Sequence, residues 1–144
     1  LYLLYAEVLN ETRTLTDDEI HDYIDVLRMR SGLEGVKDSW TKYSTNPSKP
    51  STQDGMREII HRERLIELAF EGQRYWDLRR WKKLKEYMNR PIQGWDIWET
   101  KIETFYEEPV TIAEPNFQDR DYLWPIPQDP LLKNKNLIQN PGWE

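Results

Sequence analysis

The stretch from Glu63 to Trp81 reads ERLIELAFEGQRYWDLRRW, and its pattern decides the fold class. Charged and large apolar residues alternate in it too densely for an ordinary surface helix, whose apolar residues form one stripe. Such a density needs a surrounding protein that pairs the charges and covers the rings. The stretch therefore predicts two helices, over about residues 54–71 and 74–89, that are separated by Gly72 as a C-cap or kink.

Two earlier segments also carry helical signals. Residues 1–11 are rich in Leu, Tyr and Ala, and Thr16 begins a capping box for a second helix over residues 17–30. Gly32 can take the left-handed conformation that ends this second helix. The two helices predict a hairpin that resembles one tetratricopeptide unit, so the expected fold is mainly α.

The remaining segments are expected to be irregular. Residues 33–53 contain two prolines within a short polar stretch, and they predict a loop that is attached to the body by Trp40 and Tyr43. The segment 90–144 predicts a proline-rich, irregular tail, because prolines exclude long helices and central strands.

Within that tail, residues 101–112 alternate enough to predict a short strand or a hairpin arm. We expect the tail to lie against the helices through its apolar side chains, which are Trp124, Ile126, Leu131 and Leu132.

Composition and charge bound the class of protein. The 144 residues suffice for one domain over 1–144, and the 12% share of aromatic residues indicates a folded chain. The net charge of −6, with acids interleaved among the bases, argues against nucleic-acid binding. The absence of cysteine excludes disulfides, cysteine zinc sites and thiol nucleophiles. The sequence starts at Leu1 inside an apolar helix without Met or N-cap, which predicts a piece of a longer protein.

Carboxylates around Gly72 are the first candidate for chemistry. Glu63, Glu67 and Glu71 share a spacing of four residues and so lie on one helix face. They could form a general acid/base pair, as in glycoside hydrolysis. The nearby arginines favour instead a structural network of ion pairs that joins the two helices flanking Gly72. The expected members of this network are Glu63, Glu67, Glu71, Arg74, Asp77, Arg79 and Arg80.

Glu63 carries the most specific expectation within this network. It lies on an apolar stripe of its helix, together with Ile59, Ile66 and Phe70 and with Met56 at the edge. We therefore expect its carboxylate to be buried and paired with an arginine that follows Gly72.

Other catalytic or metal-binding patterns are missing from the sequence. His21 and His61 are the only histidines, and neither has a neighbour at metal-ligand spacing, so no metal site is predicted. Phosphate-binding glycine loops and nucleophile motifs are absent as well, and no cofactor is predicted.

Tryptophans are the remaining functional signal. Trp95 and Trp98 lie in a loop beside Asp96 and Glu99, where flat rings and carboxylates could hold a sugar. The alternative, which we favour, is that both rings attach the loop to the core. Trp76 and Trp81 are expected to be core residues.

The stretch from Glu63 to Trp81 resembles the signature of the SusD/RagB family, the nutrient-binding lipoproteins of Bacteroidetes outer membranes. Further blocks agree with that family in order and spacing across essentially the whole chain. They are Ala6-Glu7 with Leu9-Asn10, residues 27–33, Leu123-Trp124-Pro125-Ile126-Pro127, Asn136-Leu137, and Gln139-Asn140-Pro141-Gly142.

The resemblance implies that the chain is the C-terminal part of a longer surface protein, with tetratricopeptide-like hairpins and long irregular loops. The whole protein would be held at the cell outer membrane by an N-terminal lipid outside this segment. It would bind an oligosaccharide, or a peptide, for a SusC-like TonB-dependent transporter, and it would not be an enzyme. In that family the ligand is held mainly by residues upstream, so Trp95 and Trp98 are candidates from local chemistry alone.

Two other functions remain open at this point. A glycan-active hydrolase would use Glu67 and Glu71, and measurable polysaccharide turnover would reveal it. A helical-repeat adaptor would bind proteins, and direct titration with sugars would distinguish it from a glycan-binding protein.

Overall fold

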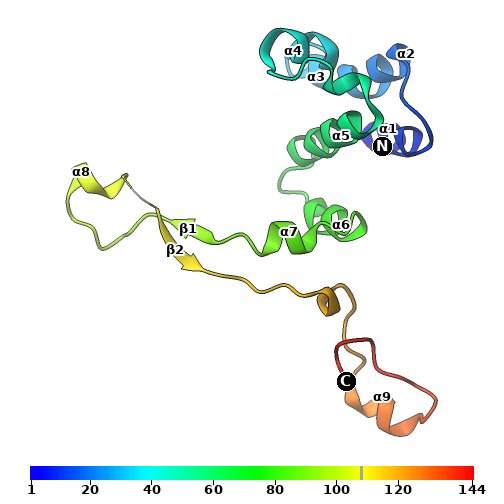
Figure 1. Ribbon diagram of the computed structural model, residues 1–144, viewed down its shortest axis with the longest axis vertical. Helices are drawn as coiled ribbons and strands as arrows, with labels where there is room; N and C mark the ends of the chain where they lie inside the picture. The colour runs from blue at the N-terminus through cyan, green and yellow to red at the C-terminus, as the bar shows by residue number, and fades with distance from the viewer. Residues whose placement is uncertain (108) are drawn as a thin grey trace. The chain divides into compact units, whose positions relative to one another are not determined.

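The computed structural model describes residues 1–107 and 109–144 and divides into two compact units (Figure 1). The first unit comprises Leu1–Arg74 and the second Tyr75–Glu144. The chain is mainly helical, as its sequence predicts. In the described residues no helix is both long and apolar enough to cross a membrane.

The first unit begins with the predicted pair of helices. Helix α1 (Tyr2–Thr12) comes first. After a turn, α2 (Asp17–Ile20), a π turn (His21–Asp25) and α3 (Val26–Arg30) follow one another without a gap and form one continuous helical segment. The capping box is present, since the Thr16 hydroxyl accepts from the Glu19 N–H at 3.3 Å and the Glu19 carboxylate accepts from the Thr16 N–H at 2.9 Å. This reciprocal pair satisfies two N–H groups at the start of α2.

The end of α3 is also as predicted. Gly32 has a φ of 75°, and the Leu33 N–H reaches back to the Arg28 carbonyl at 3.0 Å. This is the left-handed helix end that glycine adopts without steric cost.

The segment 33–53 is not a simple loop, because it contains α4 (Val36–Tyr43) and a short 3-10 turn (Lys49–Ser51). Gly35 occupies the N-cap position before α4 and has no side chain that could cap the helix. Its cap comes from the preceding helical segment, where Asp25 Oδ1 accepts a hydrogen bond from the Val36 N–H at 2.7 Å. A cap that lies eleven residues away leaves no local signal, which explains why the helix was not predicted.

Helix α5 (Gln53–Glu67) packs against α1 (Figure 1). The Thr52 hydroxyl caps it by accepting from the Gly55 N–H at 3.1 Å. The helix ends at Glu67 and not at residue 71, and Phe70 beyond it has a φ of 65°. The predicted apolar stripe is therefore wrong at this end, where Ile66 and Phe70 are exposed.

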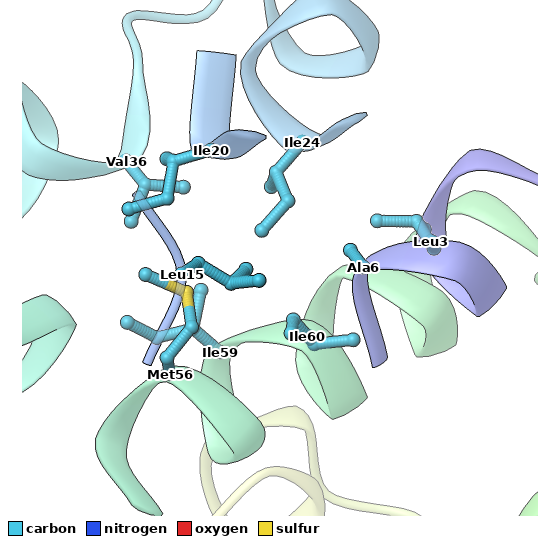
Figure 2. Close-up of a cluster of buried hydrophobic side chains, with 9 residues drawn as sticks. All are labelled: Leu3, Ala6, Leu15, Ile20, Ile24, Val36, Met56, Ile59 and Ile60. Atoms are coloured by element: carbon cyan, nitrogen blue, oxygen red, sulfur yellow. The ribbon is translucent and has the colours of Figure 1, made fainter. Parts of the chain in front are cut away.

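The core of the first unit joins α1, α2, the π turn, α4 and α5 (Figure 2). Trp40 packs half-buried against this core, as expected, whereas Tyr43 is exposed. The core consists of apolar side chains from these elements and from the turn before α2, namely Leu3, Ala6, Leu15, Ile20, Ile24, Val36, Met56, Ile59 and Ile60.

The predicted single helix over residues 74–89 is wrong, because it breaks into α6 (Gln73–Arg80) and α7 (Leu84–Met88). Lys82 has a φ of 54°, and the Lys83 N–H reaches the Leu78 carbonyl at 2.8 Å. This is the helix end that glycine usually supplies. A lysine at the left-handed position gave no sequence signal for the break.

The tail from residue 90 holds more regular structure than expected. Strand β1 (Ile92–Gly94) pairs antiparallel with β2 (Val110–Ala113), and α8 (Ile102–Phe105) lies in the excursion between them (Figure 1). The expected extended segment 101–112 is thus partly helical and partly strand, and its residue Glu108 lies outside the described residues. The two strands are short and far apart in sequence, so they lack the tight-turn signal of a hairpin.

The final segment contains a 3-10 helix (Asp119–Tyr122) and α9 (Gln128–Lys133). No long helix follows Glu114 in the described residues, in accord with the prolines there. Among the expected apolar anchors, Trp124 and Leu132 are exposed. Ile126 and Leu131 are half-buried. The segment is held by side-chain hydrogen bonds to its own backbone, described below, and by bonds from Arg79 and Asn89 to the Tyr122 and Phe117 carbonyls.

Candidate functional site

The Glu63 carboxylate accepts a hydrogen bond from the Arg28 guanidinium, which joins α3 to α5. Both side chains are only 14% exposed. Arg28 also donates to the Glu34 carbonyl at 2.9 Å and to the Ser39 hydroxyl at 3.0 Å. Glu63 is therefore paired and largely buried, but its partner lies thirty-five residues upstream and not after Gly72.

Glu67 is held in the same way one turn further along α5. Arg30 donates to both of its carboxylate oxygens, at 2.7 and 2.9 Å. Both bonds come from one guanidinium nitrogen, Nη2, so the contact is a charge-assisted hydrogen bond shared between the two oxygens. The side chain of Arg30 is 63% exposed, so this pair lies much nearer the solvent than the one at Glu63.

A buried ion pair between α1 and α5 was missed by the sequence analysis. Glu7 and Arg64 approach to 3.7 Å, and their side chains are 7% and 9% exposed. Nearby, the Asn10 amide donates to the Gln53 carbonyl at 3.0 Å, and the Gln53 amide returns a bond to the Asn10 carbonyl at 2.6 Å. The sequence does carry a signal for these contacts, because Glu7 and Asn10 lie on the same face of α1 as the core residues Leu3 and Ala6.

The predicted residues after Gly72 make further contacts within the second unit. Arg80 donates to Asp77 at 3.0 Å, and Asp77 is buried. Arg79 donates to the Tyr122 carbonyl and to the Tyr75 hydroxyl, the latter at 3.3 Å. Trp76, which was expected in the core, is 58% exposed, and Trp81 is half-buried.

The expected network across Gly72 would join the two units and stays a prediction. Glu71 is exposed beyond the end of α5, and Arg74 is half-buried in the first turn of α6.

Residues 1–107 and 109–144 contain no cluster of side chains that could bind a metal ion. No group of three or more histidines, aspartates or glutamates is close enough there to hold a metal ion. His61 is buried in α5, and His21 is exposed in the π turn.

Three aromatic rings pack together in the segment that connects β1 to β2. Trp95 lies with its ring centroid 5.4 Å from that of Tyr106, in an edge-to-face arrangement, and 6.5 Å from that of Phe105. Phe105 and Tyr106 are themselves edge to face at 4.8 Å. The expectation that both rings attach the loop to the core is wrong. Trp95 packs on rings of its own excursion and is 44% exposed, and Trp98 is 84% exposed.

The C-terminal segment is held by a polar clasp. The Gln139 side chain accepts from the Ile126 N–H at 2.8 Å and donates to the Ile126 carbonyl at 2.9 Å. The Asn140 amide donates to the Trp124 carbonyl at 2.6 Å. The Trp143 indole N–H donates to the Leu123 carbonyl at 2.8 Å. These bonds satisfy backbone groups that the prolines keep out of helices and sheets.

The SusD family model matches residues 1–143. Because this match covers nearly all of the chain, the chain belongs to the SusD family. It is 34% identical over 143 residues to SusD-like protein P2 of Formosa agariphila, with 98% of this chain covered.

Solved structures from Bacteroides fragilis agree with this assignment. A SusD-like carbohydrate-binding protein is 30% identical, with a TM-score of 0.69 over 95% of this chain. A second SusD-like protein is 29% identical, with a TM-score of 0.68 over 98% of this chain. The chain spans only 24% of the Formosa protein and 27% and 24% of these two structures.

Proposed function

We propose that this chain is the C-terminal part of a non-catalytic protein that captures nutrients at the cell surface. The nutrient is a glycan or, as an alternative ligand, a peptide, and the protein passes it to a SusC-like TonB-dependent transporter. An N-terminal lipid outside residues 1–144 holds the protein at the outer membrane. The observation that carries this proposal is the family match over residues 1–143, together with the relative described as carbohydrate-binding.

The contacts of the first unit support a scaffolding role for this part of the protein. Glu67, one of the two carboxylates that the hydrolase alternative would use, is engaged by Arg30, and Glu63 is engaged by Arg28. We propose that the helix pairs of this unit are tetratricopeptide-like and that the proline-rich tail adds long, irregular but hydrogen-bonded loops. Such a framework holds binding surfaces in place without taking part in bond breaking.

The test uses the whole protein, purified without its lipid. Native gel electrophoresis through gels that contain amylopectin, laminarin, alginate or carrageenan should show retarded migration with at least one polysaccharide. Incubation with the same polysaccharide should release no reducing ends. Release that disappears in Glu67→Gln or Glu71→Gln would favour the hydrolase and contradict the proposal.

The transporter partnership has its own experiment. An affinity-tagged whole protein, expressed in its natural host, should co-purify with a TonB-dependent barrel. Capture of the barrel without any polysaccharide or peptide binding would favour the adaptor function instead.

A further inference from the structure

The excursion between β1 and β2 is ordered by its own hydrogen bonds. Asp96 Oδ1 accepts from the Trp98 N–H at 2.9 Å, and the Asp96 carbonyl accepts from the Glu99 N–H at 3.1 Å. Glu99 Oε1 then accepts from the Lys101 N–H at 2.9 Å. Side chains that bond to the backbone two residues ahead fix a turn locally. The position of Trp98 is therefore defined by the turn that carries it.

Two tryptophans of this excursion have different environments. Trp95 is 44% exposed and packs against Phe105 and Tyr106, so this cluster joins the two ends of the excursion. Trp98 is 84% exposed, so most of its ring surface faces solvent. The backbone that carries this uncovered ring is already ordered by the turn, so it need not be ordered again when a ligand covers the ring.

We propose that Trp98 is a stacking platform for one pyranose ring of a bound oligosaccharide and that Asp96 and Glu99 accept hydrogen bonds from its hydroxyl groups. The proposal rests on the proposed glycan-binding function and adds a site to it. Trp95 is then a positioning residue, because it supports the turn without touching the sugar.

The charges around the ring favour a sugar over an anionic lipid surface. Four acidic residues accompany Trp98 in the described part of the excursion, namely Asp96, Glu99, Glu103 and Glu107, and Lys101 is the base among them. Anionic lipids attract basic segments and would be repelled here. Carboxylates are acceptors for hydroxyl groups, and flat rings contact the C–H faces of sugars.

The carboxylate of Glu99 is well suited to accept such bonds. Hydrogen bonding from the Lys101 backbone N–H lowers the pKa of Glu99 below its usual value, which favours the ionised form. The Lys101 N–H binds Oε1, and because each carboxylate oxygen has two lone-pair sites, the group keeps acceptor capacity for a ligand. Hydrogen bonds to an ionised acceptor are stronger than those between neutral groups.

The experiment compares variants of the whole protein by calorimetric titration. The probe is a soluble oligosaccharide prepared from whichever polysaccharide retards the wild-type protein in the gels. Trp98→Ala should weaken binding by about 10-fold, which corresponds to the loss of one well-stacked ring. Trp98→Phe should retain most of the affinity, because a phenyl ring still offers a flat face.

Two controls separate stacking from general apolar contact. Ile97→Ala removes an exposed aliphatic side chain from the same turn, and Trp124→Ala removes an exposed tryptophan from the C-terminal clasp. Both should bind like the wild type. The melting temperature of Trp98→Ala should also equal that of the wild type, because the ring is exposed.

Each other outcome overturns the inference. Wild-type affinity in Trp98→Ala would exclude the platform while leaving the proposed function intact. Equal losses in Trp98→Ala and Ile97→Ala, or loss of barrel co-purification with unchanged sugar binding, would identify an apolar protein-docking surface. A lowered melting temperature of Trp98→Ala would show that the rest of the protein covers the ring. Failure of the wild type to bind any polysaccharide would overturn this inference and leave a peptide as the nutrient under the proposed function.

Discussion

Arg28 donates a hydrogen bond to Glu63 from the last turns of α3 to the middle of α5, and both side chains are largely withdrawn from solvent. The same guanidinium binds the Glu34 carbonyl and the Ser39 hydroxyl, which lie before and within α4. One side chain thereby links three consecutive helices. Its five N–H donors suit this task, because a planar guanidinium can serve several acceptors at fixed angles.

Glu63→Gln should destabilise the protein by about 3 kcal/mol. The substitution keeps the shape but leaves the Arg28 charge without a counter-charge in a largely buried position, and such losses cost about 3–5 kcal/mol when burial is complete. Urea denaturation of the whole protein, followed by tryptophan fluorescence, measures the change.

Glu67→Gln is the matched control for this prediction. Its partner Arg30 is 63% exposed, and exposed pairs contribute about 0–1 kcal/mol. If the two variants lost equally little stability, the pair between Arg28 and Glu63 would not have the buried character that the structure gives it.

Gln139→Ala should loosen the C-terminal clasp without unfolding the first unit. It removes the two bonds to Ile126 and a third from the Asn140 N–H at 2.8 Å. Each such bond contributes about 1 kcal/mol net, so the amide of Ile126 should exchange with solvent at least about 10-fold faster. Hydrogen exchange with mass spectrometry detects this change.

Gln128→Ala, at the exposed start of α9, provides the comparison. It should leave exchange at Ile126 unaltered. Unchanged exchange in Gln139→Ala as well would mean that the prolines alone hold the segment.

The features of the fold that could be predicted are those with local causes. The capping box at Thr16 and the left-handed end at Gly32 depend on residues within a few positions of each other, and both are present. Helix α4 depends on a cap from Asp25, and the break after α6 depends on a lysine, Lys82, in a conformation that favours glycine. Neither of these can be inferred from neighbouring residues.

The same division applies to the charged residues. Helical spacing correctly placed Glu63 beside the apolar core residue Ile59. Choosing its partner required the tertiary arrangement of α3 and α5, and several arginines near Gly72 were equally plausible from spacing alone. The exposure of Trp98 could not be predicted in this way. Large rings usually pack inward, whereas this ring stands exposed on the turn that Asp96 caps.

Gly55→Ala should be much more damaging than Gly32→Ala. A Cβ on Gly55 would overlap the Lys49 carbonyl oxygen and would lie 2.6 Å from the Thr52 hydroxyl, at the buried start of α5. Overpacking of this kind costs about 3 kcal/mol. At Gly32 nothing lies within 4 Å of the added Cβ, so only the positive φ is strained, at about 1 kcal/mol.

Urea denaturation of the two glycine variants separates these costs. Equal destabilisation would show that backbone conformation, and not the approach of Lys49, requires the glycine at position 55. A serine at position 55 should be at least as harmful as alanine, because it adds the same Cβ and a further oxygen.

The start of α2 should lose stability in acid through Glu19. Hydrogen bonds from the Arg13 side chain and then from the Thr16 backbone lower the pKa of Glu19 from 4.5 to about 2. Because the folded pKa is depressed, the stabilisation is complete above about pH 4.5 and is lost as the pH falls towards about 2, where the unfolded state binds the proton more readily. A carboxyl titration of Glu19 by NMR measures the shift directly.

The variant Arg13→Gln removes the largest cause of the lowered pKa, so the titration midpoint of Glu19 should move back towards 4.5. A wild-type midpoint already near 4.5 would mean that the Arg13 contact does not persist in solution.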